Sequence, residues 1–393
     1  MSKRREFLMA LGVAGAAPLM LGVDGEMPLQ GALVLSGGGA HGAYEAGAIG
    51  CWVAARGIAD GVALAPYQMV FGTSVGALNG WMVATGQYTR LRELWYGVSA
   101  AKLMRLKPQF AASADPNSGA LNQLAAKLRM ASLTTDQTAM YDSQPVLDFI
   151  SRQIDPERPL VVPFVWAVTN LTEQRTEFFY RRAHDTPAQF RDAIIRVIQA
   201  IMGPQTVVRE ASLDLFHKQL FASAAIPIVW DPVPLPGPDG STCDYCDGGV
   251  ASNSSVRISH AVSRAVDVIL VDPPFEPVRT YANAIAVALG MVATMRRKIL
   301  EIDMRTAHFQ SLTKRAFARL PNADAAIAAE GDPQYAAYMQ SVPATTLSYL
   351  RPKDKLPIGT EDFDDEEGIG KTYRLGWNDA TAGLRSYDWK TFD

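Results

Sequence analysis

The sequence has few cysteines and histidines and no excess of charge of either sign. Its 393 residues include three cysteines and five histidines, and the formal net charge is −3. So few cysteines argue against a disulfide-rich scaffold. The near balance of basic and acidic residues argues against nucleic acid as a partner, because that would need a clustered basic surface. Contact with a membrane surface stays open, since a lipid interface can be met with apolar groups.

Two of the cysteines have the spacing of a metal or redox site. They are Cys243 and Cys246, and no second pair of Cys or His lies near them in the sequence to complete a zinc site. We therefore interpret them as small residues that flank a turn, or as a local disulfide if the protein is exported. The sequence predicts no metal and no cofactor.

The N-terminal apolar stretch is too short for a convincing membrane-spanning helix, and glycines and Pro18 interrupt it. Lys3, Arg4 and Arg5 precede it, and small residues follow, as in a signal peptide. We predict that residues 1–30 form a targeting segment similar to a twin-arginine export signal, or else a basic, apolar helix that stays attached. With a signal the protein would be exported, periplasmic or membrane-associated; without one it would be cytoplasmic.

The order of apolar segments and glycine turns predicts an α/β fold. Residues 32–35 read as a buried strand that enters a glycine turn, and a helix follows over 43–56 until Gly57 ends it. The same order recurs with a strand over 64–71 and a helix over 77–84. This repetition predicts a parallel sheet covered by helices. Further segments are strands over 160–170 and 177–180, helices over 190–202 and 281–319, and a cap of short helices and a loop over 98–141.

The segment Gly72-x-Ser74-x-Gly76 stands between the second strand and its helix. This is a nucleophile-elbow pattern, in which the glycines permit a sharp turn and the serine projects from the top of the sheet. The free N–H groups at the start of the helix favour negative charge that develops there. The pattern alone is weak evidence for a nucleophilic serine, and the flanking strand and helix strengthen that prediction.

The first glycine turn permits two functions. Gly37-x-Gly39-x-x-Gly42 after a strand matches the fingerprint of a dinucleotide site, which needs an acidic residue at the end of the next strand. Asp60 lies near that distance but ahead of the strand. Successive amides of Gly37, Gly38 and Gly39 would instead suit an oxyanion hole.

A third motif is Asp247-Gly248-Gly249, which would be an ordinary turn if it stood alone. A Ser–His–Asp triad in α/β-hydrolase order needs a histidine in a loop after the acid. We place His308 within the long helix and His260 near the start of a helix, so structural roles are expected for both.

These three motifs, in this order, resemble those of the patatin-like phospholipase family, and the match spans residues 31–272. The segments 222–227 and 376–380 and the Asn253 that follows the Asp motif also look like the family. The resemblance implies a three-layer α/β/α patatin-like sandwich with a mainly parallel central sheet over residues 31–275. A mostly helical C-terminal extension over 276–393 would pack on this domain.

The resemblance also implies a mechanism. Ser74 would be the nucleophile and Asp247 the proton acceptor of a catalytic dyad. Gly37, Gly38 and Gly39 would form the oxyanion hole, and the motifs are supported by His41, Gly42, Gly72, Gly76, Gly248 and Gly249. The substrate would be a lipid or another acyl ester. The family usually has Lys or Arg where this chain has His41, so the resemblance implies a preference for phosphoglycerides less strongly here, and a neutral acyl ester is an alternative substrate. The alternatives are a silent lipid-binding protein of the same fold and a nucleotide-binding oxidoreductase that uses the Gly37–Gly42 loop.

Overall fold

The structure is a computed structural model, and it describes residues 29–108, 138–186, 190–273, 284–317, 319, 322, 345–360, 362–388 and 392. Nearly all of the expected targeting segment and residues 109–137 of the expected cap lie outside these ranges.

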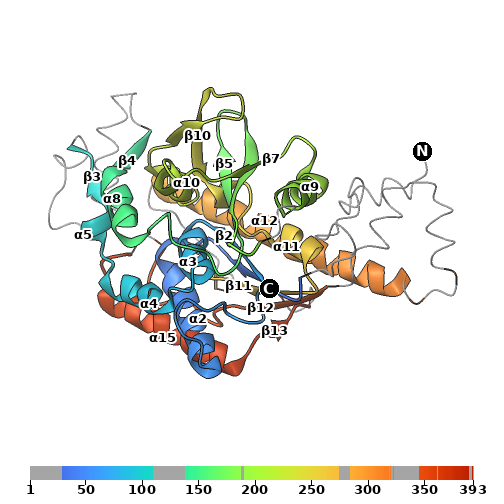
Figure 1. Cartoon of the computed structure of the whole chain (residues 1–393). Coiled ribbons are helices and arrows are strands. Elements are labelled where there is room, and N and C mark those ends of the chain that lie inside the picture. The colour runs from blue at the N-terminus through green and yellow to red at the C-terminus, as the bar shows by residue number, and fades with distance from the viewer. Residues whose placement is uncertain are drawn as a thin grey trace.

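Within the described residues, a ten-stranded mixed sheet forms the centre of the molecule (Figure 1). Five neighbouring strands are parallel, in the order β12, β11, β1, β2, β5, and antiparallel strands extend the sheet at both ends. The strands are β1 (Ala32–Leu35), β2 (Met69–Thr73), β5 (Phe164–Asn170), β6 (Arg175–Arg181), β7 (Val207–Glu210), β9 (Val233–Pro236), β10 (Thr242–Asp247), β11 (Ala265–Ile269), β12 (Thr346–Leu350) and β13 (Arg385–Ser386).

Helices cover both faces of this sheet. Leu33 and Leu35 of β1 face one apolar core, and Ala32 and Val34 face the other, as the two-residue repeat of a strand requires. The first core is closed by α2 (Gly42–Arg56), α3 (Val75–Ala84), α4 (Tyr88–Gly97), α8 (Gln144–Gln153), α10 (Phe216–Ala222) and α15 (Glu366–Ala382), and the second by α9 (Phe190–Met202), α11 (Val256–Val262) and α12 (Ala284–Phe317). The expected three-layer α/β/α sandwich is confirmed.

Strand β5 brings two distant parts of the chain together on the same side of it. Its first residues pair with β2 in parallel, and its last residues pair with β10 in antiparallel direction. Thr73 lies opposite Ala167, and Asp247 lies opposite the next residue, Val168. The end of β2 and the end of β10 therefore meet at the same point of the sheet.

The described part of the C-terminal region is mainly helical, as expected, but it also adds strands to the sheet. β12 continues the parallel core beyond β11, and β13 pairs with β12. Helix α15 packs closely on α2, because a Cβ atom on Gly47 would overlap the carbonyl oxygen of Tyr373, and one on Gly376 would overlap that of Tyr44. Only glycine allows two backbones to approach so closely.

Two predicted strands begin later than expected, and proline is the physical reason. β2 begins at Met69 rather than near residue 64, after a turn that contains Pro66. β5 begins at Phe164, directly after Pro163. Proline has no N–H to donate to a neighbouring strand, so each strand starts beyond it. The predicted long helix is α12, and none of the described helices is both long and apolar enough to cross a bilayer.

The expected turn around Cys243 and Cys246 was wrong, because both residues lie inside strand β10. They are three positions apart, so their side chains point to opposite faces of the sheet. Both thiols are buried and free, which also contradicts the local disulfide.

The described ends of the expected cap form a small sheet with a later part of the chain. β3 (Arg105–Leu106) pairs with β4 (Ala139–Asp142), and β4 pairs with β8 (Ile228–Trp230). The short helix α5 (Ala100–Leu103) precedes β3.

Candidate active site

Ser74 occupies a strained turn between β2 and α3. Its φ is 56°, in the left-handed region that a residue with a side chain rarely adopts, which costs about 1–3 kcal/mol. The turn is crowded, since a Cβ atom on Gly72 would lie 2.7 Å from the Cα of Ala77, and one on Gly76 would lie 2.7 Å from the Ser36 oxygen. The expected elbow geometry is therefore present, with the serine held at the start of α3.

Replacing Gly76 with alanine is expected to destabilise the fold by roughly 1–3 kcal/mol or more, because the new methyl group meets rigid backbone atoms. Urea unfolding measures the change. Gly97→Ala is the matched control, since a Cβ atom there meets nothing within 4 Å, and it should stay within about 0.5 kcal/mol of the wild type. Equal stability of the two variants would contradict the crowded turn.

Asp247 lies against the Ser74 hydroxyl. The Ser74 Oγ donates a hydrogen bond of 2.6 Å to Asp247 Oδ2. The other carboxylate oxygen, Oδ1, accepts a hydrogen bond of 2.6 Å from the N–H of Gly249. Asp247 therefore ends β10 and caps a short 3₁₀ turn over Gly248–Val250, rather than standing in a hairpin.

The environment of Asp247 makes it a stronger base than a solvated carboxylate. Burial raises the pKa of its carboxyl to about 6, and the hydrogen bonds from Ser74 and Gly249 and the positive charge of Arg296 oppose this rise. A base whose pKa lies near neutrality is better matched to proton transfer than one near 4. At pH 7 most of this carboxyl is ionised and able to accept a proton.

Ser223 is a site residue that the sequence analysis did not identify. Its Oγ accepts a hydrogen bond of 2.9 Å from the backbone N–H of Ser74 and donates one of 2.7 Å to the carbonyl of Ala167. The backbone carbonyl of Ser223 also accepts the N–H of Gly248. Ser223 thus ties the elbow to the Asp247 turn through β5. The only sequence signal was its place in the segment 222–227, which looks like the corresponding segment of the family.

The glycine loop after β1 lies beside the two reactive groups. A Cβ atom on Gly37 would lie 2.9 Å from the Cβ of Ser74 and 2.8 Å from Oδ1 of Asn253. In the described part of the chain, the N–H groups of Gly37, Gly38 and Gly39 donate to no protein acceptor. Gly39 has φ 56° and packs against the backbone of Thr360. Free N–H groups next to Ser74 can donate hydrogen bonds to an anion.

The His41 side chain contacts the C-terminal region. Its Nε2 lies 2.9 Å from the carbonyl oxygen of Ile358, which fixes that nitrogen as the donor. Burial lowers the pKa of His41, although the nearby Asp272 carboxylate raises it. The ring is neutral at pH 7, so it supplies no cation.

His260 and His308, for which structural roles were expected, both contact neighbouring elements of the fold. His260 lies in the last turn of α11 rather than near a helix start, and its Nε2 lies 2.8 Å from the Ser311 hydroxyl of α12. His308 lies within α12 and contacts the ring of Tyr387. No group of three or more His, Cys, Asp or Glu side chains that could hold a metal occurs among the described residues.

Among the described residues, no carboxylate stands at the end of the strand after the glycine loop, where a dinucleotide site would need one. The strand that follows the glycine loop ends at Thr73 and Ser74, not at a carboxylate. Asp60 is committed elsewhere, because its Oδ1 accepts the N–H groups of Tyr88 and Thr89 at the start of α4.

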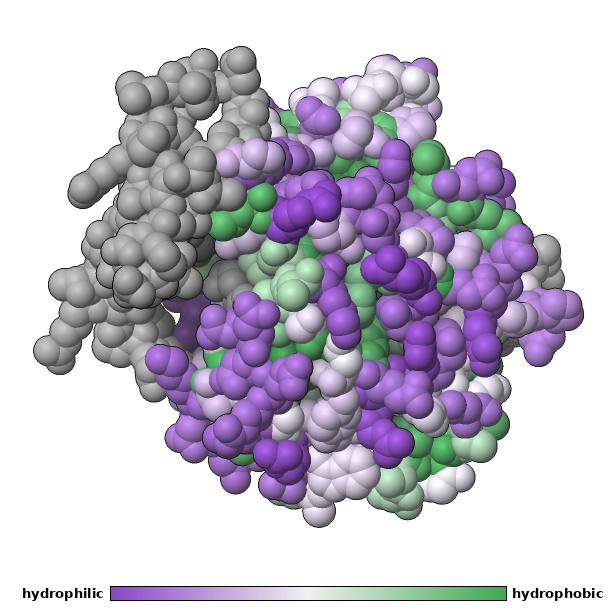
Figure 2. Space-filling view, turned by 90° about the vertical axis from the view of Figure 1, so that its left-hand side faces the viewer, coloured by the Kyte–Doolittle hydropathy of each residue, from purple (hydrophilic) through white to green (hydrophobic). Residues whose placement is uncertain are grey.

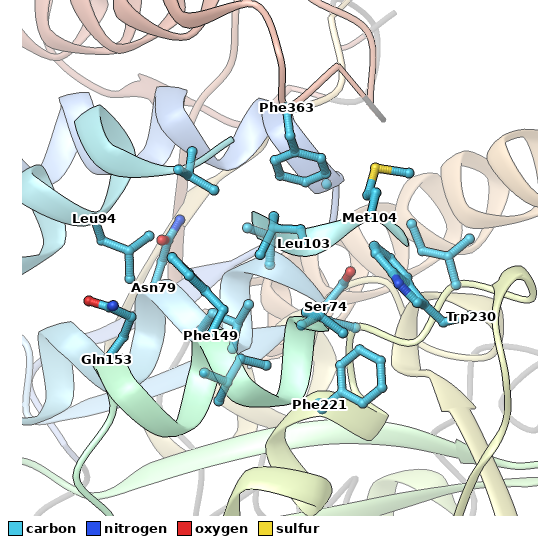
Figure 3. A pocket seen from close by; sticks show the side chains of 18 of the residues that line it. Ser74, Asn79, Leu94, Leu103, Met104, Phe149, Gln153, Phe221, Trp230 and Phe363 are labelled. Carbon is cyan, nitrogen blue, oxygen red and sulfur yellow. The ribbon is translucent and has the colours of Figure 1, made fainter. Parts of the chain in front are cut away.

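Ser74 lines an apolar pocket that extends between α3, α4 and α8 (Figure 3). It contains about 820 Å³ of atom-free space, including its opening to solvent, and none of the described side chains that line it is charged. Figure 3 shows Ser74 among Leu103, Met104 and Trp230, whereas Leu94 and Gln153 lie at the opposite side. Figure 2 shows that the face of the molecule that carries α5 and α8 has hydrophobic residues among mainly hydrophilic ones. Such a pocket fits a hydrocarbon chain.

A comparison of the sequence with family models identifies the family of the chain. A family model described as patatin-like phospholipase matches residues 33–259, from β1 into α11. A solved structure to which the chain is similar is VipD from Legionella pneumophila, with 13% sequence identity and a TM-score of 0.38 over 95% of this chain and 71% of that one. The search of curated proteins gave no match. Because the family model covers more than half of the sequence and includes all three motifs, the chain belongs to the patatin-like phospholipase family, and with it to the lipid acyl hydrolases.

Proposed function

We propose that the protein hydrolyses acyl esters of lipids with Ser74 as nucleophile and Asp247 as the only general base. The observation that carries this proposal is the 2.6 Å hydrogen bond from Ser74 Oγ to the buried Asp247 carboxylate, beside an apolar pocket that Ser74 lines. No histidine is needed between them, because the carboxylate contacts the hydroxyl directly.

In the first half of the reaction, Ser74 Oγ forms a bond to the ester carbonyl carbon while its proton passes to Asp247 Oδ2. The carbonyl oxygen becomes an oxyanion, which the N–H groups of Gly37, Gly38 and Gly39 stabilise, each by roughly 3 kcal/mol. The bond from carbon to the alcohol oxygen then breaks, and Asp247 gives its proton to that oxygen. The products are the free alcohol and an acyl group on Ser74.

The second half repeats these steps with water. Asp247 accepts a proton from the water molecule that attacks the acyl carbon, and the same amides hold the second oxyanion. The bond from carbon to Ser74 Oγ breaks, the proton returns to Oγ, and the fatty acid leaves.

Labelling by a fluorophosphonate tests whether Ser74 is activated. We expect the probe to modify the wild-type protein at Ser74, and Ser74→Ala to remain unlabelled, because only an activated serine attacks the probe readily. Labelling of neither protein would support the silent lipid-binding alternative instead. A panel of lipid classes then identifies the preferred head group.

In this proposal the acyl chain of the substrate occupies the apolar pocket, and Gln153 limits the length of chain that fits. Its Oε1 accepts a 2.6 Å hydrogen bond from Arg90 Nη2. Gln153, Leu94 and Phe149 also line a neighbouring polar groove that includes Arg152, so these three side chains form the wall between the two spaces. A hydrocarbon chain longer than the pocket would have to displace this wall.

Gln153→Ala is expected to shift hydrolysis toward longer chains, by roughly fourfold for each additional methylene that enters. The measurement is kcat/KM across p-nitrophenyl esters from butyrate to hexadecanoate. Gln144→Ala, at the exposed start of α8, is the matched control and should keep the wild-type profile. An unchanged profile in Gln153→Ala would place the end of the chain elsewhere.

Export and contact with a membrane surface are part of the proposal on the strength of the sequence alone. The basic and apolar pattern of residues 1–30 supports export, and the lipid class of the substrate supports membrane contact.

A further inference from the structure

A second hollow lies on the Asp247 side of the dyad. It contains about 750 Å³ of atom-free space, including open solvent, and its walls include Asp247, Gly249 and residues of α12. Ile226 and Thr360 line both this hollow and the apolar pocket, so the two spaces adjoin beside the reactive groups.

The two spaces differ in charge. The described lining of the apolar pocket has no charged side chain, whereas Asp247 and Arg296 line the second hollow. Arg296 comes from α12, beyond the segment that the family model matches. Its Cδ would lie 3.3 Å from a Cβ atom on Gly249, which places the side chain directly beside the Asp247 turn.

The guanidinium of Arg296 is held in place and keeps donors for a ligand. Its Nη2 donates a 2.6 Å hydrogen bond to Asp272 Oδ1. The buried Nε of Arg296 and the buried Oδ2 of Asp272 have no partner among the described residues, so the pair makes a single contact rather than a bidentate one. A guanidinium can bind carboxylate at one nitrogen and an oxyanion at others, since it has five N–H donors.

The order of bond breaking determines which part of the substrate enters this hollow. With the acyl chain in the apolar pocket, the alcohol oxygen must leave toward the group that protonates it, and that group is Asp247. The second hollow is the space on that side. This step rests on the proposed function.

We propose that the hollow beside α12 binds the alcohol part of the ester, and that Arg296 selects alcohols that carry a phosphate group. Guanidinium matches the geometry of phosphate oxygens and binds them most strongly where water is largely excluded. The Arg296 side chain is 13% exposed, which meets that condition. The neutral His41 nearby adds no charge, so Arg296 provides the cation.

The test compares two lipids with identical acyl chains: dioctanoyl phosphatidic acid and dioctanoylglycerol. In the wild type we expect a higher kcat/KM for the phosphatidic acid. In Arg296→Gln the ratio of the two values should fall by roughly tenfold or more. Because Arg296 also acts on the pKa of Asp247, each ratio is taken at the pH optimum of that variant, where a general loss of catalysis cancels.

Two further variants make the result specific. Arg296→Lys keeps the positive charge but loses the planar set of N–H donors of the guanidinium. Its ratio of kcat/KM values should lie between those of the wild type and Arg296→Gln. Arg305→Gln, on the surface of the same helix, should keep the wild-type ratio. If Arg296→Gln does not fold, inhibition of the wild type by glycerol 3-phosphate at concentrations where glycerol has no effect supports the same site.

A wild type that prefers dioctanoylglycerol, or an Arg296→Gln variant that keeps the wild-type ratio, would overturn the proposal. Equal inhibition by glycerol and glycerol 3-phosphate would also overturn it. Absence of both lipid hydrolysis and fluorophosphonate labelling would refute the proposed function instead.

Discussion

Ser74→Ala and Asp247→Asn are each expected to lower kcat/KM for p-nitrophenyl esters by roughly 10³-fold or more. Ser74→Ala removes the atom that bonds to the acyl carbon. Asp247→Asn keeps the shape of the side chain but cannot accept the proton from Ser74 Oγ, which lies 2.6 Å away. The double variant should lose little more than either single variant, because the two groups act in one step.

The controls separate chemistry from folding. Ser241→Ala changes an exposed serine in a turn and should keep wild-type activity. Circular dichroism and urea unfolding should show that both dyad variants are folded. Turnover near the wild-type level in either dyad variant would refute the mechanism.

Local patterns in the sequence were sufficient for the two glycine turns and the elements around them. The strand before Gly37 and the helix that Gly57 ends were predicted because both signals lie within a few residues of one another. The structure confirms them as β1 and α2, with Gly57 in the left-handed conformation at the helix end. Ser74 was predicted as a nucleophile for the same reason.

Contacts between distant segments could not be read from the residues alone. Asp247 faces Ser74 because β10 and β2 pair with successive residues of β5, and no local pattern reports that register. The family resemblance gave the pairing that the residues did not. Ser223 and Arg296 were missed because neither stands in a motif of its own. Their positions follow from the packing of α10 and α12 around the ends of the strands.

The pH dependence of activity is expected to follow the ionisation of Asp247. Burial raises the pKa of its carboxyl to about 6. The protonated carboxyl cannot accept the Ser74 proton, so kcat/KM should fall about tenfold for each pH unit below 6 and level off above 7. Initial rates with a soluble ester between pH 4 and pH 8 measure this fall of kcat/KM at low pH. A profile that stays level down to pH 5 would contradict a buried aspartate base.

The same ionisation predicts that Asp247→Asn, which lowers activity, raises the stability of the fold at neutral pH. The pKa of Asp247 is higher in the folded protein than its ordinary value of 3.8, so the fold favours the protonated form. The stability that the raised pKa contributes is fully present below about pH 4 and is lost as the pH rises through 6. At neutral pH an ionised, buried carboxylate remains. Asparagine removes this charge and can keep the contacts with Ser74 and Gly249. Asp247→Asn should therefore be more stable than the wild type at pH 8, by up to about 3 kcal/mol, with the difference shrinking toward pH 4. Urea unfolding at both pH values measures it. A variant that is less stable at pH 8 would show that Asp247 serves mainly to stabilise the fold. If the carboxylate is retained for catalysis, the variant should be inactive but more stable.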